Sequence, residues 1–153
     1  MRIEDILKLN ADIPLSKSVI VNLLYTSGKI NGELNKVLKP YDISLQQFNV
    51  LRILRGQKGN PASLSVVQDR MISKMSNTTR LVDKLIKKGL VKKRINKTNR
   101  RKIDIKITTE GLAFLKSIDT LIDSSEVNMV NSLTDKEATE LIRLLSKIRL
   151  IAN

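Results

Sequence analysis

The sequence predicts a mainly helical chain with one small β-hairpin, a fold of the α+β class. Apolar residues recur three and four positions apart over most of the 153 residues, which is the spacing of one face of an α-helix. One stretch, residues 102–107, instead alternates between charged residues and isoleucine, which indicates a half-buried strand. Aromatic residues make up only 3% of the chain, so the core must consist of Leu, Ile and Val. Together these observations favour packed helices over a β-sandwich.

The net charge of the chain and its lack of Cys and His narrow the range of functions it can have. Lys and Arg number 28 against 15 Asp and Glu, which gives a formal net charge of +13. Such an excess attracts polyanions, of which nucleic acid is the commonest. The chain has neither Cys nor His, which excludes disulfides, thiolate zinc sites and catalysis by Ser–His or Cys–His pairs. We therefore expect no enzymatic activity, no cofactor and no metal site.

The sequence gives no sign of a membrane protein. No stretch approaches the roughly 20 apolar residues that a membrane-spanning helix needs. The first five residues include two acidic ones and are not followed by the apolar run of a signal peptide. We therefore expect a cytoplasmic protein.

The first long helix is predicted over residues 15–39. Pro14 suits the start of a helix, and Pro40 ends it. Gly28 and Gly32 lie inside this helix and cost about 1 kcal/mol each relative to Ala. They permit either the close approach of another helix or a bend.

Two shorter helices follow. Ser44 and Gln47 form a capping box that opens a helix ending near Arg55, with Phe48, Leu51 and Leu54 on one face. Ser63 then caps a short helix that ends at residue 71. Just before this cap, Ala62 could pair with the later hairpin as a third strand.

The next helix and the hairpin form the basic part of the chain. The helix is predicted over residues 75–88, with Leu81 and Leu85 inward and Arg80, Lys84 and Lys88 on the opposite face. A left-handed Gly89 ends it. The strands are predicted at residues 91–95 and 102–107, with the isoleucines of the second strand inward.

Two further helices complete the chain. The first begins after Thr108 and ends near Ser124, and a second capping box at residues 134–137 opens the last one. The stripe of the first is Leu112, Leu115, Ile118, Leu121 and Ile122, and that of the last is Ala138, Leu141, Leu144, Leu145, Ile148 and Ile151. A unit of this size cannot bury these stripes and that of residues 15–39 on itself, so we expect a two-fold dimer.

Two short helices followed by a basic two-stranded ribbon is the order of a winged helix-turn-helix. The chain reads Ser-Leu-x-Gln-Phe-x-Val-Leu-x-x-Leu at residues 44–54, Thr-Arg-Leu-Val-Asp-Lys-Leu-Ile-x-Lys-Gly-Leu-Val at residues 79–91 and Ile-Thr-x-x-Gly at residues 107–111. This order resembles the MarR (multiple antibiotic resistance regulator) family of bacterial repressors over residues 15–150.

The sequence contains no internal repeat and no low-complexity linker, so we expect one fold unit over residues 1–153, which the resemblance makes a single MarR-like domain. It has dimerisation helices at about residues 15–39 and 109–150 and a winged-helix DNA-binding lobe at about residues 44–107. The resemblance also implies a homodimer that binds a pseudo-palindromic operator in double-stranded DNA and releases it when a small molecule enters the crevice between the lobes. By this analogy, the candidates for the ligand pocket are Tyr25, Tyr41 and Phe48. The alternative, that they are core or interface aromatics, is favoured for each of them.

Residues at the front of the basic helix are the candidates for reading DNA bases: Ser76, Asn77, Thr79 and Arg80. Short polar side chains can approach base edges, and Asn suits adenine and Arg suits guanine, each good pair discriminating by about 1–3 kcal/mol. The alternative for the polar cluster is an ordinary helix cap. The neighbouring Arg80 and the basic wing favour DNA contact.

Contacts to the DNA backbone and minor groove are assigned separately. Candidates for the backbone are Ser63, Lys84, Lys88 and Lys92, with Lys87, Lys93 and Arg94 beside them; the alternative is a solvated charged face. Arg100 and Arg101 at the hairpin tip are the candidates for the narrow, negative minor groove rather than a merely charged tip. The family usually has Asp before this arginine pair, where this chain has Asn99, so which arginine enters the groove stays open.

Four functions compete for this sequence. The first is a sequence-specific repressor that responds to a ligand, and the second is an architectural or nucleoid-type DNA binder with little sequence choice. An enzyme lacks support, because the chain shows no paired carboxylates, glycine-rich phosphate loop or nucleophile–base set. A peripheral membrane protein would need a basic helix with an exposed bulky apolar face.

Overall fold

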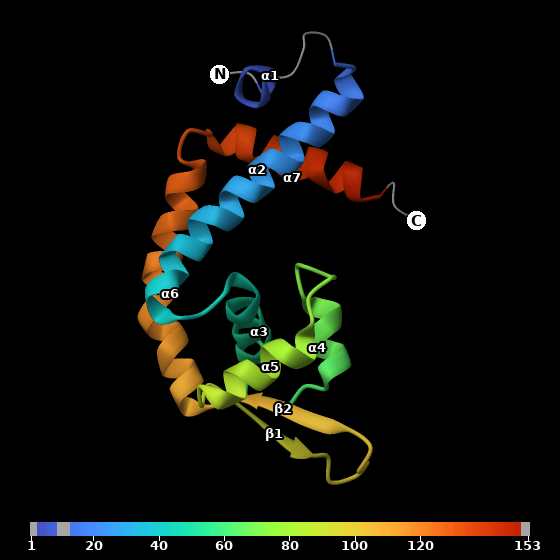
Figure 1. Cartoon of the computed structure of the whole chain (residues 1–153), viewed down its shortest axis with the longest axis vertical. Helices are drawn as coiled ribbons and strands as arrows, with labels where there is room; N and C mark the ends of the chain where they lie inside the picture. Colours follow the sequence, from blue (N-terminus) through green and yellow to red (C-terminus); the bar gives the residue numbers. More distant parts are fainter. Residues whose placement is uncertain (1–2, 9–12, 151–153) are drawn as a thin grey trace.

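The computed structural model describes residues 3–8 and 13–150. Its elements are α1 (Ile3–Leu7), α2 (Leu15–Leu38), the 3₁₀ helix η1 (Lys39–Tyr41), α3 (Leu45–Arg55), α4 (Leu64–Arg70), α5 (Thr78–Lys87), β1 (Val91–Ile95), β2 (Ile103–Ile107), α6 (Thr109–Val130) and α7 (Asp135–Arg149). The predicted class, mainly helical with one antiparallel hairpin, is confirmed (Figure 1). None of the helices in the described part of the chain is long and apolar enough to cross a membrane.

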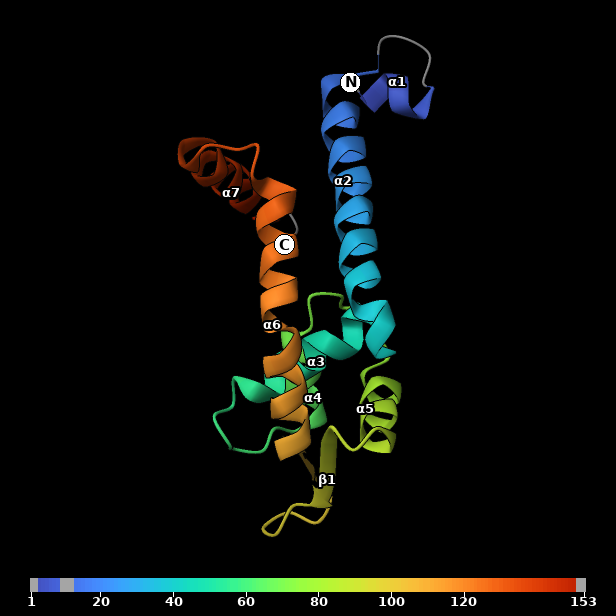
Figure 2. The same ribbon diagram turned by 90° about the vertical axis from the view of Figure 1, so that its left-hand side faces the viewer.

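The elements form a lobe and an arm. The lobe holds α3, α4, α5 and the hairpin, while α2 and α6 extend away from it in the same general direction (Figures 1 and 2). Helices α1 and α7 lie at the far end of this arm. Helices α2 and α7 overlap in the view of Figure 1, but Figure 2 shows that they are separated in space.

The hydrophobic core lies in the lobe and is built around α3. The capping box at Ser44 and Gln47 is present as predicted, and it starts α3 so that Phe48, Leu51 and Leu54 all point inward. Buried residues of the other elements close around this face: Leu38, Ile43, Ala62, Val67, Met71, Val82, Leu85, Val91, Ile105, Ile107, Leu115, Ile118 and Ile122. Each fully buried aliphatic side chain contributes about 1.5–3 kcal/mol of transfer free energy, so the lobe is the stable part of the chain.

The hairpin begins in the core and ends outside it. Its register pairs Val91 with Ile107 and Ile95 with Ile103. Ala62 bridges Ile105 through two backbone hydrogen bonds of 2.9 and 2.8 Å, so the expected third strand is a single bridge. The prediction that Ile103 points inward is wrong: it is 47% exposed and its partner Ile95 is 65% exposed. Ile105 and Ile107 of the second strand are buried as predicted, but the far end of the hairpin extends beyond the part of the lobe that could cover Ile95 and Ile103.

Two helix boundaries differ from the prediction. Helix α5 begins at Thr78 instead of residue 75, because Asn77 is its N-cap and the two residues before it belong to a loop. Helix α6 continues to Val130, beyond the expected end near Ser124. The backbone stays helical through Ser124 and the residues that follow it.

The arm leaves much apolar surface uncovered. Within the described part of the chain α7 buries none of its residues, and three residues predicted to point inward, Leu141, Leu144 and Ile148, are exposed. On α6, Leu112 and Leu121 are also exposed, while Leu115, Ile118 and Ile122 are buried as predicted. Ile151 lies outside the described residues. The stripes expected on the arm are therefore present in the sequence but not satisfied within one chain.

Candidate nucleic-acid interface

The helix pair of the lobe is joined by a short, fixed loop. Ser63 caps α4 as predicted, accepting a hydrogen bond of 3.3 Å from the Val66 N–H. The side chain of Gln68, in α4, holds the following loop at two points. It donates a hydrogen bond to the Lys74 carbonyl at 2.9 Å and accepts one from the Thr78 hydroxyl. Because Thr78 is buried, this second bond fixes the start of α5 against α4.

Helix α5 presents one polar face to solvent. Its buried side holds Thr78, Val82 and Leu85, whereas a shallow hollow on the open side is lined by Asn77, Thr79, Arg80, Asp83, Lys84 and Lys87. Several short or cationic side chains therefore lie together on one exposed helix face. Such a face can approach both base edges and phosphates.

The four candidates for base contact are not equivalent. Thr79 and Arg80 are exposed in the first turn of α5. Asn77 is exposed too, but its Oδ1 caps the helix by accepting a 3.1 Å hydrogen bond from the Arg80 N–H. Its amide Nδ2 has no hydrogen-bond partner among the described residues, so it is available to a partner outside the chain, as is the second lone pair of Oδ1. Ser76 precedes the helix and its hydroxyl oxygen is enclosed by protein atoms, so its placement at the helix front was wrong.

The end of α5 fixes the position of the wing. Gly89 adopts a φ of +72°, as its predicted C-cap role requires. The Gly89 N–H donates to the Ile86 carbonyl at 2.9 Å and the Leu90 N–H to the Leu85 carbonyl at 3.0 Å, which closes the helix in a Schellman motif. Thr108, at the end of β2, donates its hydroxyl to the Gly89 carbonyl at 2.7 Å. Both strands are thereby anchored to the C-terminal end of α5.

Three of the basic residues that were assigned to the DNA backbone are held in ion pairs. Lys88 is paired with Asp42, Lys93 with Asp83 at 3.0 Å, and Arg94 with Asp104 at 3.5 Å. The hydrogen bond from Lys88 holds the pKa of the Asp42 carboxyl below its usual value, since it stabilises the charged form. The other three lysines assigned to the DNA backbone, Lys84, Lys87 and Lys92, are exposed.

Two of the acidic partners, Asp104 and Asp42, differ in how far the sequence alone predicts them. Asp104 could have been found, because the strand register places it opposite Arg94. Asp42 could not, because it lies 46 positions from Lys88 and only the tertiary fold brings them together.

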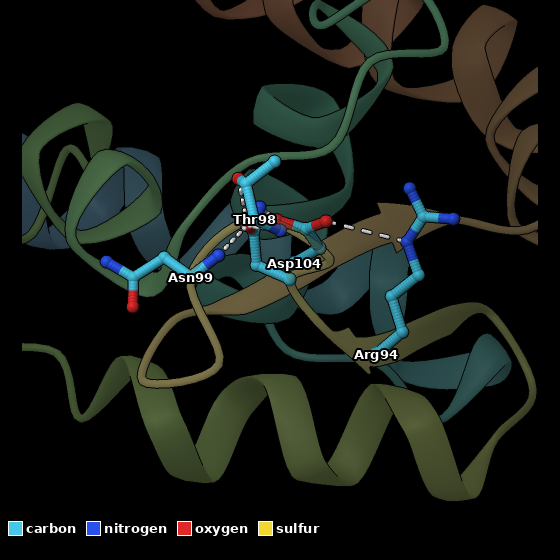
Figure 3. A network of polar contacts seen from close by, with 5 residues as sticks. Arg94, Thr98, Asn99 and Asp104 are labelled. Atoms are coloured by element: carbon cyan, nitrogen blue, oxygen red, sulfur yellow. Dashed lines mark hydrogen bonds and ion pairs between the residues drawn. The ribbon is translucent and has the colours of Figure 1, made fainter.

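The turn of the wing is organised by Asn96, whose partners Thr98, Asn99 and Asp104 are labelled in Figure 3. Its Oδ1 accepts from the Thr98 N–H at 3.0 Å, from the Thr98 hydroxyl at 2.7 Å and from the Asn99 N–H at 2.9 Å. Its Nδ2 donates to the Asp104 carboxylate at 2.9 Å, and the other oxygen of that carboxylate faces Arg94. A chain of polar contacts thus runs from the strand pair into the turn.

Arg100 and Arg101 stand exposed at the tip of this turn. Asn99, which occupies the position where Asp is usual, accepts a 3.1 Å hydrogen bond from the Arg101 N–H. Its side chain therefore supports the backbone of the tip. The two guanidinium groups lie beyond a turn that is itself well ordered by hydrogen bonds.

The three aromatic candidates for a ligand pocket do not come together. Phe48 lines a cavity of about 340 Å³ between α2, α3, the loop after α4 and α6, with Arg52 5.7 Å from the centre of its ring. Tyr41 packs edge-on against Phe114 at 6.0 Å between ring centres, and Tyr25 lies beside Lys29 on α2. Neither tyrosine lines that cavity. Of the three candidates, Phe48 is the one that lines this cavity.

A helix pair, an exposed polar face on its second helix and an anchored two-stranded wing define a winged helix-turn-helix protein that binds DNA. The model of the MarR family matches residues 43–103. The multiple antibiotic resistance protein MarR of Escherichia coli is 30% identical over 142 residues, covering 91% of this chain and 93% of that protein. The chain belongs to the MarR family and is a transcriptional regulator.

Two further comparisons bear on its function. The transcriptional repressor MprA of E. coli is 28% identical over 121 residues, covering 76% of this chain and 69% of that protein. A crystal structure of a mutant E. coli MarR complexed with operator DNA is 26% identical and has a TM-score of 0.77, covering 89% of this chain and 99% of that one.

Proposed function

We propose that this chain is a homodimeric repressor that acts in the cytoplasm on a pseudo-palindromic operator and releases it when a small molecule binds. The observation that carries the proposal is the joint exposure of Thr79 and Arg80 on α5 and of Arg100 and Arg101 at the wing tip. The first pair suits base edges in the major groove, and the second suits the neighbouring minor groove. The named relatives, a repressor and an operator-binding protein, support this assignment.

In this proposal the remaining candidates serve the DNA backbone. Lys84 and Lys92 are exposed and suited to phosphate contacts, and the amide of Asn77 is available beside them. Ser63 already caps α4, and the N–H groups at the start of that helix can still face a phosphate. Lys88 contributes only if its pair with Asp42 opens.

The dimer is supported by the uncovered apolar surface of the arm. Leu15 and Leu24 of α2, Val127 of α6 and Ile142 of α7 are all exposed in one chain. Burying such faces against a second copy removes them from water and sets two α5 helices in fixed relation. Sedimentation of the chain as a monomer at micromolar concentration would contradict this part of the proposal.

A small-molecule effector is supported by the cavity that Phe48 and Arg52 line. Its volume of about 340 Å³ lies within the usual range for ligand sites, roughly 300–1,000 Å³. It lies between arm and lobe, so an occupant could alter how α5 is held relative to a partner copy. Its position supports regulation, while the chemistry of the effector is a separate question.

The proposal is tested by selecting bound DNA from a random pool. A homodimeric repressor should enrich an inverted repeat whose half-sites are one helical turn apart, roughly 34–36 Å. An architectural DNA binder would instead retain duplexes without a shared motif. Enrichment of a single half-site, or of none, would contradict the proposed mode of binding.

A further inference from the structure

The loop between α4 and α5 holds two large hydrophobic side chains out in solvent. Ile72 is 85% exposed and Met75 is 95% exposed. Met75 lies two residues before the N-cap of α5 and therefore next to the face that carries Thr79 and Arg80. An apolar side chain at this place has no role in the core, and the base-contact assignments above do not use it.

The exposure of Met75 is built into the loop. Gln68 bonds to the Lys74 carbonyl on one side of Met75 and to the Thr78 hydroxyl on the other. Between them the Ser76 N–H donates to the Ser73 carbonyl at 3.2 Å, and the Ser76 hydroxyl is enclosed by the protein. With its neighbour turned inward and both flanks tied to Gln68, Met75 is directed away from the body.

The two exposed residues face different surroundings. Ile72 lines the cavity between arm and lobe, together with Met71 and Ser73. Met75 is not among the residues that line this cavity. The exposed face of α5, which follows Met75 in the chain, is lined by two short polar residues, three cationic ones and one carboxylate, that of Asp83. A cationic neighbourhood suits the approach of a polyanion, so the apolar contact for Met75 should be found on nucleic acid.

We propose that Met75 is a further specificity-determining residue, whose side chain contacts the C5-methyl group of a thymine in the major groove. Thymine carries the methyl group that distinguishes its base edge there. The unbranched thioether is flexible and polarizable, so it can follow a methyl group without a preformed pocket. The inference rests on the proposed function, and it adds a preference for thymine beside the base pair that Arg80 reads.

The experiment uses the DNA site recovered from the random pool. Each thymine of one half-site is replaced in turn by deoxyuridine, which removes the methyl group and keeps the pairing. Binding of the full-length chain is compared with that of Met75→Ala, Met75→Leu and Ile72→Ala. We expect one position at which loss of the methyl weakens binding of the natural chain by roughly fourfold, the effect of removing one buried methyl-sized group.

The variants then show whether this sensitivity to the thymine methyl group depends on Met75. Met75→Ala should bind the thymine and deoxyuridine sites equally at this position, whereas Met75→Leu and Ile72→Ala should keep the discrimination. Full discrimination by Met75→Ala, or no methyl-sensitive thymine at all, would overturn the contact while leaving the repressor proposal standing. A pool that enriches no site would overturn both. Because Met75 is exposed, an unchanged thermal unfolding midpoint confirms that Met75→Ala is folded.

Discussion

Lys88, at the C-terminal end of α5, is hydrogen-bonded to the carboxylate of Asp42, at the junction between the arm and the lobe. Asp42 has a φ of 52°, a left-handed conformation that Asp tolerates better than most residues. The pair links the helix proposed to read DNA directly to the base of α2. It also withholds from DNA a lysine that the sequence suggested was free.

Replacing Asp42 by Asn should release Lys88 for a phosphate contact. We expect Asp42→Asn to bind the operator more tightly at low salt, and the slope of log K against log salt to steepen by up to about 0.9, the value for one added phosphate contact. Stability should change little, because Asp42 is exposed. Titrations by fluorescence anisotropy over a range of salt concentrations would measure the slope.

Glu33→Gln is the matched control for this change. It also removes one negative charge and frees a lysine, Lys36, whose Nζ lies 2.6 Å from the Glu33 carboxylate on α2. If both variants steepen the slope equally, the effect comes from net charge and the Asp42 tether has no special role. The double variant Asp42→Asn/Lys88→Ala should lose the gain.

The tether should persist across the neutral pH range. The folded-state pKa of Asp42 lies below the usual 3.8 because Lys88 donates to the charged carboxylate. The stabilisation is therefore fully present above the unfolded pKa and is lost only as the pH falls through the lower folded value. The difference between Asp42→Asn and the natural chain should then stay constant from about pH 5 to pH 8. A difference that vanished on acidification within this range would contradict the assignment.

Two substitutions can distinguish the role of Asn77 as the N-cap of α5 from its proposed role in DNA contact. Asn77→Ala removes the cap of α5 and should lower the free energy of unfolding by about 0.5–2 kcal/mol. Asn77→Ser keeps an oxygen for the Arg80 N–H, so stability should be nearly unchanged, but it removes the amide. If the amide contacts DNA, Asn77→Ser weakens operator binding; equal affinities of Asn77→Ser and the natural chain would leave Asn77 as a cap alone.

Sequence reasoning succeeded where the signal was local. The capping boxes at Ser44 and Thr134 predicted the starts of α3 and α7 because both of their hydrogen bonds form within four residues. Gly89 was predictable as a left-handed C-cap for the same reason. The start of α5 was misplaced because several polar residues could serve as the cap, and only the contacts of Gln68 show that the loop extends to Asn77.

The site depended more on contacts between distant segments. The exposed face of α5 followed from helical spacing, so Arg80 and Lys84 could be placed correctly on it. The pairing of Lys88 with Asp42 and the separation of Tyr25, Tyr41 and Phe48 depend on how the arm meets the lobe. No spacing rule within one element carries that information. The exposure of Ile95 and Ile103 could not be predicted either. Alternation in the sequence shows which face of a strand is apolar, but it does not show how far the core extends along that face.

Gly111, the last residue of the Ile-Thr-x-x-Gly motif, lies where the structure leaves no space for a side chain. A Cβ at this position would lie 2.2 Å from the Leu90 carbonyl oxygen and 2.7 Å from the Ile107 side chain. We therefore expect Gly111→Ala to lower the free energy of unfolding by about 1–3 kcal/mol, the usual cost of overpacking. Denaturant unfolding followed by circular dichroism would measure it.

Gly32→Ala is the matched comparison, with the opposite expected sign. Gly32 lies inside α2, and a Cβ there would meet no atom within 4 Å. Alanine should therefore raise stability by up to about 1 kcal/mol through its helix propensity. If the Gly32→Ala variant is instead less stable, and the loss grows on dilution, a second copy approaches Gly32 closely. Close approach of another helix is one of the two interpretations that the sequence allowed for this glycine.

Arg80 and Lys84 lie on the same face of α5, yet they should fail in different ways when replaced. Arg80→Ala should weaken binding to the selected operator by about 1–3 kcal/mol and leave binding to a scrambled duplex nearly unchanged, because a base contact carries the sequence information. Lys84→Ala should weaken binding to both duplexes and reduce the salt slope by about one, because a phosphate contact does not depend on sequence. Both residues are exposed, so neither substitution should unfold the chain. Equal losses on both duplexes for Arg80→Ala would remove it from the base-reading set and shift specificity to Thr79 and the amide of Asn77.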